Sequence, residues 1–254
     1  MTKIEINDLK FTYPGDNFGL KIKHLTFSEG MIAIIGQNGA GKSTLLRLLS
    51  GLNQPDSGEI TVEGQNLNDY IGDKRLERIG LTFQDPNDQI FNATVKKEVE
   101  WGLRQMDKPE TEVERITEEV LQEVGLADKM DENPYDLSLS ERKLLSIATV
   151  VAVRPKILLF DEPMMSLDWP SRKKITAIFR YLADRGHVVI TITHDMDWVL
   201  EEYEDVYAMA HGELVYSGKT SEFFESPSLD FSNRRVWLKK SASCCRKQPR
   251  SSAN

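Results

Sequence analysis

The sequence predicts an α/β fold, with a mostly parallel sheet, a small antiparallel β part and an inserted helical subdomain. Two continuous apolar runs, at 31–35 and 157–160, are typical of fully buried strands. Segments with helical periodicity follow both runs. Strands that alternate with helices favour a mostly parallel sheet covered on both faces. A nearly all-helical stretch from about 93 to 152 interrupts this alternation and indicates an insertion.

The N-terminal elements follow from the spacing of apolar residues. Isoleucine and leucine alternate with polar residues at 4–6 and 20–22, which predicts short strands within the first 35 residues. The buried strand 31–35 leads into a glycine-rich turn and then a helix over 42–50. Gly51 is its expected stop, because glycine readily adopts the left-handed conformation that ends a helix.

The later elements repeat this pattern. An apolar face predicts a helix over 111–124, and a second helix is expected from near Ser140 to just before Pro155. The strand 157–160 comes next. A helix around 175–182, which ends by Gly186, and a final strand over 188–193 complete the alternation.

Composition excludes several classes of protein. The chain has 254 residues, with 32 Lys and Arg against 40 Asp and Glu, so a net charge of −8 argues against electrostatic nucleic-acid binding. No apolar run approaches the roughly 20 residues of a membrane span, and no secretory leader is visible. The adjacent Cys244 and Cys245 form no disulfide framework and suit a reducing cytosol. Residues 227–254 are basic, and we expect them to form a disordered tail.

A phosphate-binding motif follows the first buried strand. Residues 36–43 fit the pattern G-x-x-x-x-G-K-[ST], between a strand and a helix. Glycines let the backbone N–H groups wrap around phosphates, the lysine reaches the β- and γ-phosphates, and the serine holds Mg²⁺. The candidate nucleotide-binding residues here are Gly36, Gln37, Asn38, Gly39, Ala40, Gly41, Lys42, Ser43 and Thr44.

Five further candidates stand outside this loop. Asp161 and Glu162 end the strand 157–160, where Asp161 is expected to anchor Mg²⁺ and Glu162 to act as general base for the attacking water. Gln84 follows an apolar run and is a candidate for contact with Mg²⁺ or with that water. His194 follows the strand 188–193 and is placed to contact the γ-phosphate. The ring of Tyr13 is a candidate for stacking on adenine.

The order of these motifs resembles the ATP-binding-cassette (ABC) ATPases, over residues 1–226. The resemblance implies a P-loop NTPase core that hydrolyses ATP with Mg²⁺, and a head-to-tail dimer with two ATP molecules between the subunits. The second subunit would be either identical or different. The motifs that carry it are Tyr13, GQNGAGKST at 36–44, Gln84, LSLSE at 137–141, ILLFDEP at 157–163, SLD at 166–168 and His194.

The segment 137–141 departs from the family's L-S-G-G-Q signature. Leu139 and Ser140 replace two glycines, and a leucine side chain obstructs the approach of the backbone to a partner's γ-phosphate. Ser138 remains to donate its hydroxyl, and Ser140 is expected to cap the helix that follows. If the chain pairs with itself, both sites should be weak. If it pairs with a subunit that has an intact signature, the site built on its own Lys42 is complete.

A narrower resemblance covers FQDPNDQIF at 83–91, which is similar to a stretch of the energy-coupling-factor importers. It implies a transmembrane coupling subunit that docks between Asp85 and Phe91, a separate substrate-binding membrane subunit, and a vitamin or transition-metal ion as cargo in a prokaryote. The chain would then lie at the cytoplasmic face of the membrane, with no nucleic-acid partner. The alternative is a soluble, non-transport ABC ATPase, for example in iron–sulfur assembly, which would not need this stretch.

Overall fold

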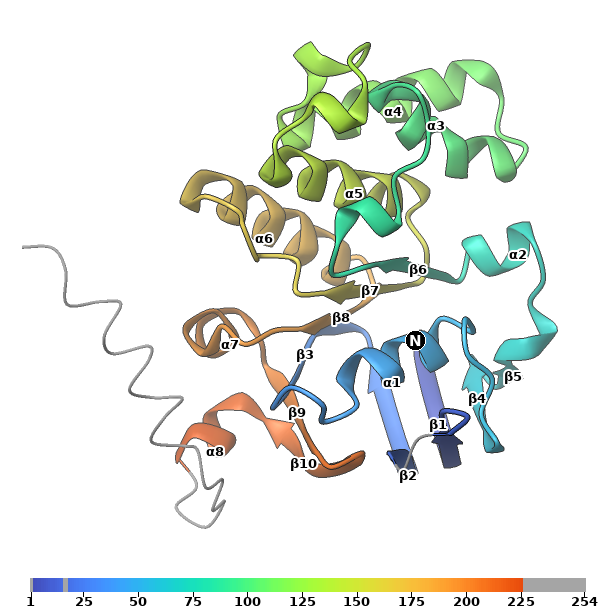
Figure 1. The fold of residues 1–254 in the computed structure, drawn as a ribbon, viewed down its shortest axis with the longest axis vertical. Helices are drawn as coiled ribbons and strands as arrows, with labels where there is room; N and C mark the ends of the chain where they lie inside the picture. The colour runs from blue at the N-terminus through green and yellow to red at the C-terminus, as the bar shows by residue number, and fades with distance from the viewer. Residues whose placement is uncertain (1, 16–17, 226–254) are drawn as a thin grey trace, which may run out of the picture.

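The computed structural model describes residues 2–15 and 18–225 (Figure 1). The predicted basic tail at 227–254 lies outside the described residues. Within them, the chain forms ten strands: β1 (Lys3–Thr12), β2 (Gly19–Ser28), β3 (Gly30–Gly36), β4 (Ser57–Val62), β5 (Gln65–Asn66), β6 (Ile79–Thr82), β7 (Ile157–Asp161), β8 (Val188–Ile192), β9 (Asp205–Ala210) and β10 (Glu213–Lys219).

The helices lie mostly where apolar periodicity predicts them. Among the described residues no helix has the length and apolarity needed to cross a membrane. The α-helices are α1 (Lys42–Leu49), α2 (Asp73–Leu76), α3 (Val95–Gln105), α4 (Glu110–Val124), α5 (Leu139–Val153), α6 (Trp169–Ala183), α7 (Met196–Glu202) and α8 (Thr220–Glu225). Short 3₁₀ helices occupy Leu67–Asp69, Pro86–Asp88, Ala127–Lys129 and Pro134–Asp136.

All ten strands form one sheet, in the order β5-β4-β1-β2-β10-β9-β3-β8-β7-β6. The run from β9 to β6 is parallel throughout, and each of the strands β5, β4, β1 and β2 is antiparallel to its neighbour among these four. Strand β10 joins the two parts, because it pairs antiparallel with β9 and parallel with β2. The predicted fold class is confirmed. The antiparallel strands β1 and β2 are ten residues each, longer than the short strands predicted.

The core lies on both faces of the sheet. Side chains of a strand alternate between faces, so Ala33 and Ile35 of β3 join one apolar cluster while Ile32 and Ile34 join the other. The first cluster includes buried residues of α3 to α6, and the second includes those of α1 and of the antiparallel strands. Helices therefore cover both faces of the parallel part, as the sequence predicts.

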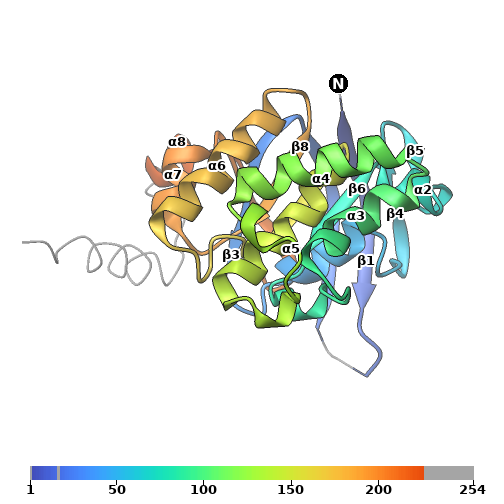
Figure 2. The same ribbon diagram turned by 90° about the horizontal axis from the view of Figure 1, so that it is seen from above.

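Helices α3, α4 and α5 form the insertion between β6 and β7, which are neighbouring parallel strands (Figures 1 and 2). Helix α4 ends at Gly125, which has the left-handed φ of 82° expected of a glycine stop. These helices occupy the predicted range, from about 93 to 152. The division of residues 1–226 into a core and a helical subdomain stays a prediction.

Candidate functional site

The motif 36–43 forms a tight loop between β3 and α1. Two of its glycines are required by geometry. A Cβ on Gly36 would lie 2.4 Å from the carbonyl oxygen of Met209, and Gly41 has a left-handed φ of 98°. The loop delivers Lys42 to the first position of α1, so the N–H groups at the start of this helix are available to an anion.

Lys42 is buried, with 7% of its surface exposed. Its Nζ donates to the carbonyl oxygens of Gly36 at 2.8 Å and of Gln37 at 2.9 Å. Burial lowers the pKa of Lys42, and the nearby charges of Glu162 and Asp161 oppose this. The ammonium group is thus held inside the loop, where phosphate oxygens could replace the two carbonyls.

The acidic pair ends strand β7. Asp161 is 8% exposed. Glu162 has a left-handed φ of 49°, which is a strained conformation for a residue with a side chain. The Glu162 backbone N–H donates to the carbonyl of Ile192 at 3.0 Å, at the end of the neighbouring strand β8. His194 follows two residues later, and its Nε2 lies 3.4 Å from Glu162 Oε1.

The environment of Glu162 shifts its acidity toward neutral pH. Burial is the main cause that raises the pKa of Glu162 to about 7, and the charge of Asp161 adds to it. The His194 backbone N–H, Lys42 and Lys143 act in the opposite direction. Burial, and then Lys42, lower the pKa of His194. A carboxyl group with a pKa near 7 is suited to take up a proton at neutral pH, as a general base must.

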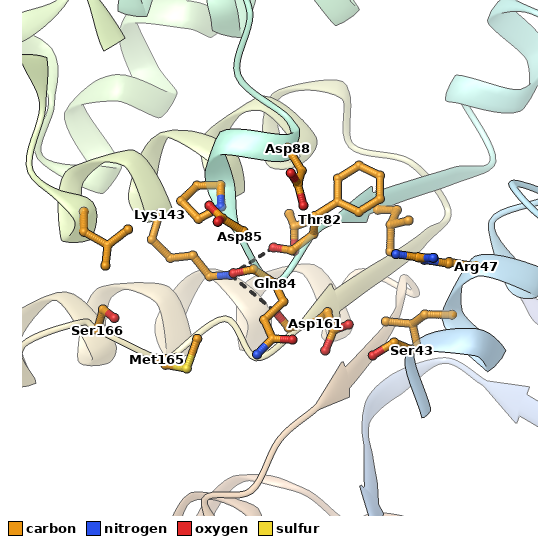
Figure 3. Close-up of a pocket in the computed structure, with 15 residues that line it drawn as sticks. Ser43, Arg47, Thr82, Gln84, Asp85, Asp88, Lys143, Asp161, Met165 and Ser166 are labelled. Carbon is orange, nitrogen blue, oxygen red and sulfur yellow. Dashed lines mark hydrogen bonds between the residues drawn. The ribbon is translucent and has the colours of Figure 1, made fainter. Parts of the chain in front are cut away.

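A cavity of about 390 Å³ brings together Ser43 of α1, Gln84 after β6 and Asp161 of β7 (Figure 3). These are the three residues predicted to hold Mg²⁺. Their hydroxyl, amide and carboxylate oxygens suit this ion, which usually takes one or two carboxylates together with phosphates and water. These oxygen donors fit a magnesium ion whose remaining ligands are phosphate oxygens and water. The described residues contain no group of three His, Cys, Asp or Glu side chains that could hold a metal.

Tyr13 lies apart from this cavity. Its ring packs edge to face with that of Phe11, with centroids 4.8 Å apart, and its hydroxyl accepts a hydrogen bond from Asn53 at 3.3 Å. Burial raises the pKa of Tyr13, but hydrogen bonds with Thr44, Asn53 and Arg47 outweigh it and lower the pKa overall. Hydrogen bonds from residues of α1 to the hydroxyl therefore fix the orientation of the half-buried ring.

The start of α5 corrects one prediction. Ser138, not Ser140, is the N-cap. Ser138 Oγ accepts the backbone N–H of Glu141 at 3.3 Å, and the Glu141 carboxylate accepts the Ser138 backbone N–H at 2.9 Å and its hydroxyl at 2.7 Å. The reason is the reciprocal capping box, whose S-x-x-E spacing fits Ser138 and Glu141. Hydrogen bonds from Lys129 and then from Ser138 lower the pKa of Glu141 to about 2.

The cavity also contains Lys143, which the sequence analysis did not single out. Leu139, 48% exposed, and Ser166 line it too, and both belong to motifs named from the sequence. Asp85 and Asp88 line it as well, so the predicted docking stretch adjoins the predicted metal site. A lysine within the apolar run of α5 was the available signal for Lys143. Ser166 has a left-handed φ of 69°, and nothing about a serine at this position predicts that conformation from the sequence.

Comparison with known proteins decides the family. The ABC transporter family profile matches residues 20–165, which is more than half of the chain. The chain belongs to the ABC transporter family. The recognition and the ATPase activity inferred from the sequence are thereby confirmed, and ATP is the nucleotide.

Three relatives of this ABC ATPase show how far the similarity extends. The energy-coupling factor transporter ATP-binding protein EcfA of Carboxydothermus hydrogenoformans is 37% identical over 86% of this chain and 81% of its own. The cbiO1 structure from Clostridium perfringens, part of an ABC transporter complex, has a TM-score of 0.75 at 28% identity. The match covers 94% of this chain and 98% of cbiO1. The structure of a dimeric ATP-binding cassette bound to ADP and Pi has a TM-score of 0.77 at 26% identity. The match covers 85% of this chain and 98% of that cassette.

Proposed function

We propose that this ABC ATPase powers an energy-coupling-factor importer for a vitamin or a transition-metal ion, at the cytoplasmic face of a prokaryotic membrane. The observation that carries the proposal is the 83–91 stretch, FQDPNDQIF, in a chain whose relatives include EcfA proteins and cbiO1. Transport also needs a transmembrane coupling subunit and a substrate-binding membrane subunit. Nucleic acid has no part in it, which agrees with the net charge of −8.

Hydrolysis uses the residues around the phosphate loop. The loop from Gly36 to Thr44 cradles the phosphates of ATP, with Lys42 on the β- and γ-phosphates, and Tyr13 stacks on adenine. Ser43, Gln84 and Asp161 would hold Mg²⁺, which would neutralise charge on the phosphates when bound. Glu162 takes a proton from the attacking water. His194, held 3.4 Å from Glu162, contacts the γ-phosphate side of the site.

The docking surface combines the stretch between Asp85 and Phe91 with an exposed aromatic cluster. Phe91 and Trp101 are 60% and 43% exposed, and their rings pack edge to face with centroids 5.3 Å apart. Exposed Tyr135 donates to the carbonyl of Ile90 at 2.9 Å and so extends the cluster. A coupling helix that presents apolar side chains would cover this patch.

Asp85 and Asp88 have unequal roles in that surface. Asp85 caps the 3₁₀ helix Pro86–Asp88, because its Oδ1 accepts the backbone N–H of Asn87 at 2.9 Å. A change at Asp85 would therefore disturb the loop itself. Asp88 is exposed and can pair with an arginine of the partner. The aromatic side chains give the cleaner test of docking.

The second ATPase subunit of the dimer is proposed to be a different chain. Leu139 projects from the start of α5, and the Ser138 hydroxyl is already bonded to the Glu141 carboxylate. Both features weaken this chain's signature as a donor to a γ-phosphate. A partner with two glycines at these positions would complete the site that contains Lys42 and Glu162.

The test is purification of the tagged full chain from its own cells in mild detergent, followed by identification of the proteins that accompany it. We expect a coupling membrane protein, a small substrate-binding membrane protein and a second cassette ATPase to accompany the chain. The paired change Phe91→Ala with Trp101→Ala should release the membrane proteins and leave ATP binding intact, whereas the control Tyr181→Ala, an exposed aromatic on α6, should release nothing. A wild-type chain that brings down no membrane protein would favour the soluble ATPase instead.

A further inference from the structure

Lys143 is a buried cation to which the proposed hydrolysis assigns no role. It lies in the second turn of α5 and is 2% exposed. Its Nζ donates to the carbonyl oxygens of Phe83 and Gln84, both at 3.0 Å, and of Asp161 at 3.3 Å. An ammonium group has three N–H donors, so these three carbonyls use its full capacity.

The three carbonyls come from two segments that carry proposed site residues. Phe83 and Gln84 belong to the loop after β6, and Asp161 ends β7 immediately before Glu162. Figure 3 shows Lys143 reaching from α5 to the loop of Gln84 and to Asp161. One side chain thus joins three separate elements at the cavity.

A burial of this kind needs compensation. Removal of an ammonium group from water is costly unless it is paired. Burial lowers the pKa of Lys143 to about 8, and the charges of Asp161, Glu162 and Asp85 oppose that shift. A methionine would fill a similar volume without this cost, but it would leave three carbonyl oxygens without their donor. Packing alone therefore gives no reason for a lysine at this position.

We propose that Lys143 is a positioning residue for ATP hydrolysis, which fixes the Gln84 loop and the Asp161–Glu162 turn relative to each other. The inference rests on the proposed roles of Gln84, Asp161 and Glu162. Gln89 also ties the loop to α5, since its Nε2 donates to the Ser146 carbonyl at 2.9 Å and to Thr149 Oγ1 at 2.7 Å. Only Lys143, of these two, reaches the acidic turn as well.

The link has a mechanical consequence. Helix α5 belongs to the inserted helices, while the acidic turn belongs to the parallel sheet. Because Lys143 bonds to both loops, a displacement of α5 moves the amide of Gln84 and the carboxylates of Asp161 and Glu162 together. A misplacement of catalytic groups by about 1 Å can lower a catalytic rate by about 10²-fold. We therefore expect loss of this link to lower kcat and to leave the affinity for ATP nearly unchanged.

The experiment compares Lys143→Met and Lys143→Arg in the full chain within its complex. Steady-state phosphate release gives kcat and KM, and titration with a fluorescent ATP analogue gives Kd. Lys143→Met should lower kcat by about 10–100-fold, with Kd changed less than about threefold because Lys143 does not touch the phosphate loop. Lys143→Arg, which keeps the charge and several donors, should recover much of the loss.

Ser146→Ala is the matched control. Ser146 is fully buried in the same helix, but its hydroxyl donates only within α5, to the Lys143 carbonyl at 2.9 Å. Its loss should lower the melting temperature slightly and leave kcat near that of the wild type. If Lys143→Met fails to fold, Lys143→Gln takes its place, with kcat expected in the order Lys, Arg, Gln.

Two results would overturn the inference. One is a kcat within about threefold of wild type in Lys143→Met or Lys143→Gln. The other is an equal loss of ATP affinity and kcat that Lys143→Arg does not rescue, which would indicate general loosening of the fold. A wild-type complex that releases no phosphate would contradict the ATPase function itself, and the role of Lys143 with it.

Discussion

Replacement of Glu162 by glutamine should stabilise the fold at alkaline pH. Burial raises the pKa of Glu162 from 4.5 to about 7 in the folded chain. Below pH 4.5 the carboxyl is neutral in the folded and the unfolded state, and it carries no penalty. As pH rises from 4.5 to 7, the unfolded chain releases the proton more readily than the folded one, so stability falls. The penalty is complete above pH 7.

The size of the effect follows from the same shift. A change from 4.5 to about 7, at about 1.4 kcal/mol per pKa unit, sets an upper limit of about 3.5 kcal/mol. The Glu162 side chain is 15% exposed, so water reduces the penalty, and we expect about 1–2 kcal/mol. For a domain of this length, 1 kcal/mol changes Tm by about 2–4 °C. Glu162→Gln should therefore raise Tm at pH 8 by about 2–8 °C.

The assay is thermal unfolding, followed by circular dichroism, of wild type and Glu162→Gln without nucleotide or Mg²⁺. At pH 5 the gain in Tm should shrink to a small part of its value at pH 8. Glu201→Gln, at an exposed position of α7, is the matched control and should change the free energy of unfolding by less than about 0.5 kcal/mol at both pH 5 and pH 8. A gain in Tm that is the same at pH 5 and pH 8, or absent at pH 8, would show that ionised Glu162 does not destabilise the fold.

Three further outcomes follow from the site. Lys42→Met should weaken ATP binding by at least about tenfold, measured by titration, because it removes the cation inside the phosphate loop; unchanged affinity would count against the loop assignment. The ratio kcat/KM, which reports the free enzyme, should rise from pH 6 to pH 8 as Glu162 loses its proton, and a flat profile would exclude Glu162 as the base. Leu139→Gly with Ser140→Gly should speed the slow hydrolysis of the isolated chain, whereas fast, cooperative hydrolysis by the isolated wild type would contradict the proposed unlike partner.

The central site was predictable because its residues follow neighbouring parallel strands. Strands β3, β7 and β8 end at one edge of the sheet, so Lys42, Glu162 and His194 converge there although they are far apart in sequence. Each also stood in a local pattern that the sequence displays. Local pattern and strand order together were sufficient to predict that these three residues lie near one another.

Other features depend on contacts that no local pattern contains. The position of Lys143 depends on how α5 packs over two loops from other parts of the chain. The single pair between β10 and β2, Glu213 with Lys21, joins the antiparallel part to the parallel part and gives no periodic signal. The capping box at Ser138 is a different case, since its S-x-x-E spacing is a local pattern that the sequence displays and that favours Ser138 over Ser140.

The most direct test of the account is the rate of phosphate release by the complex purified in mild detergent, for wild type and Glu162→Gln, with ATP binding measured in parallel. If Glu162 is the general base of an ATPase that drives an importer, Glu162→Gln should still bind ATP while phosphate release falls by about 10²–10⁴-fold. Retention of more than about a tenth of the wild-type rate by Glu162→Gln would contradict it.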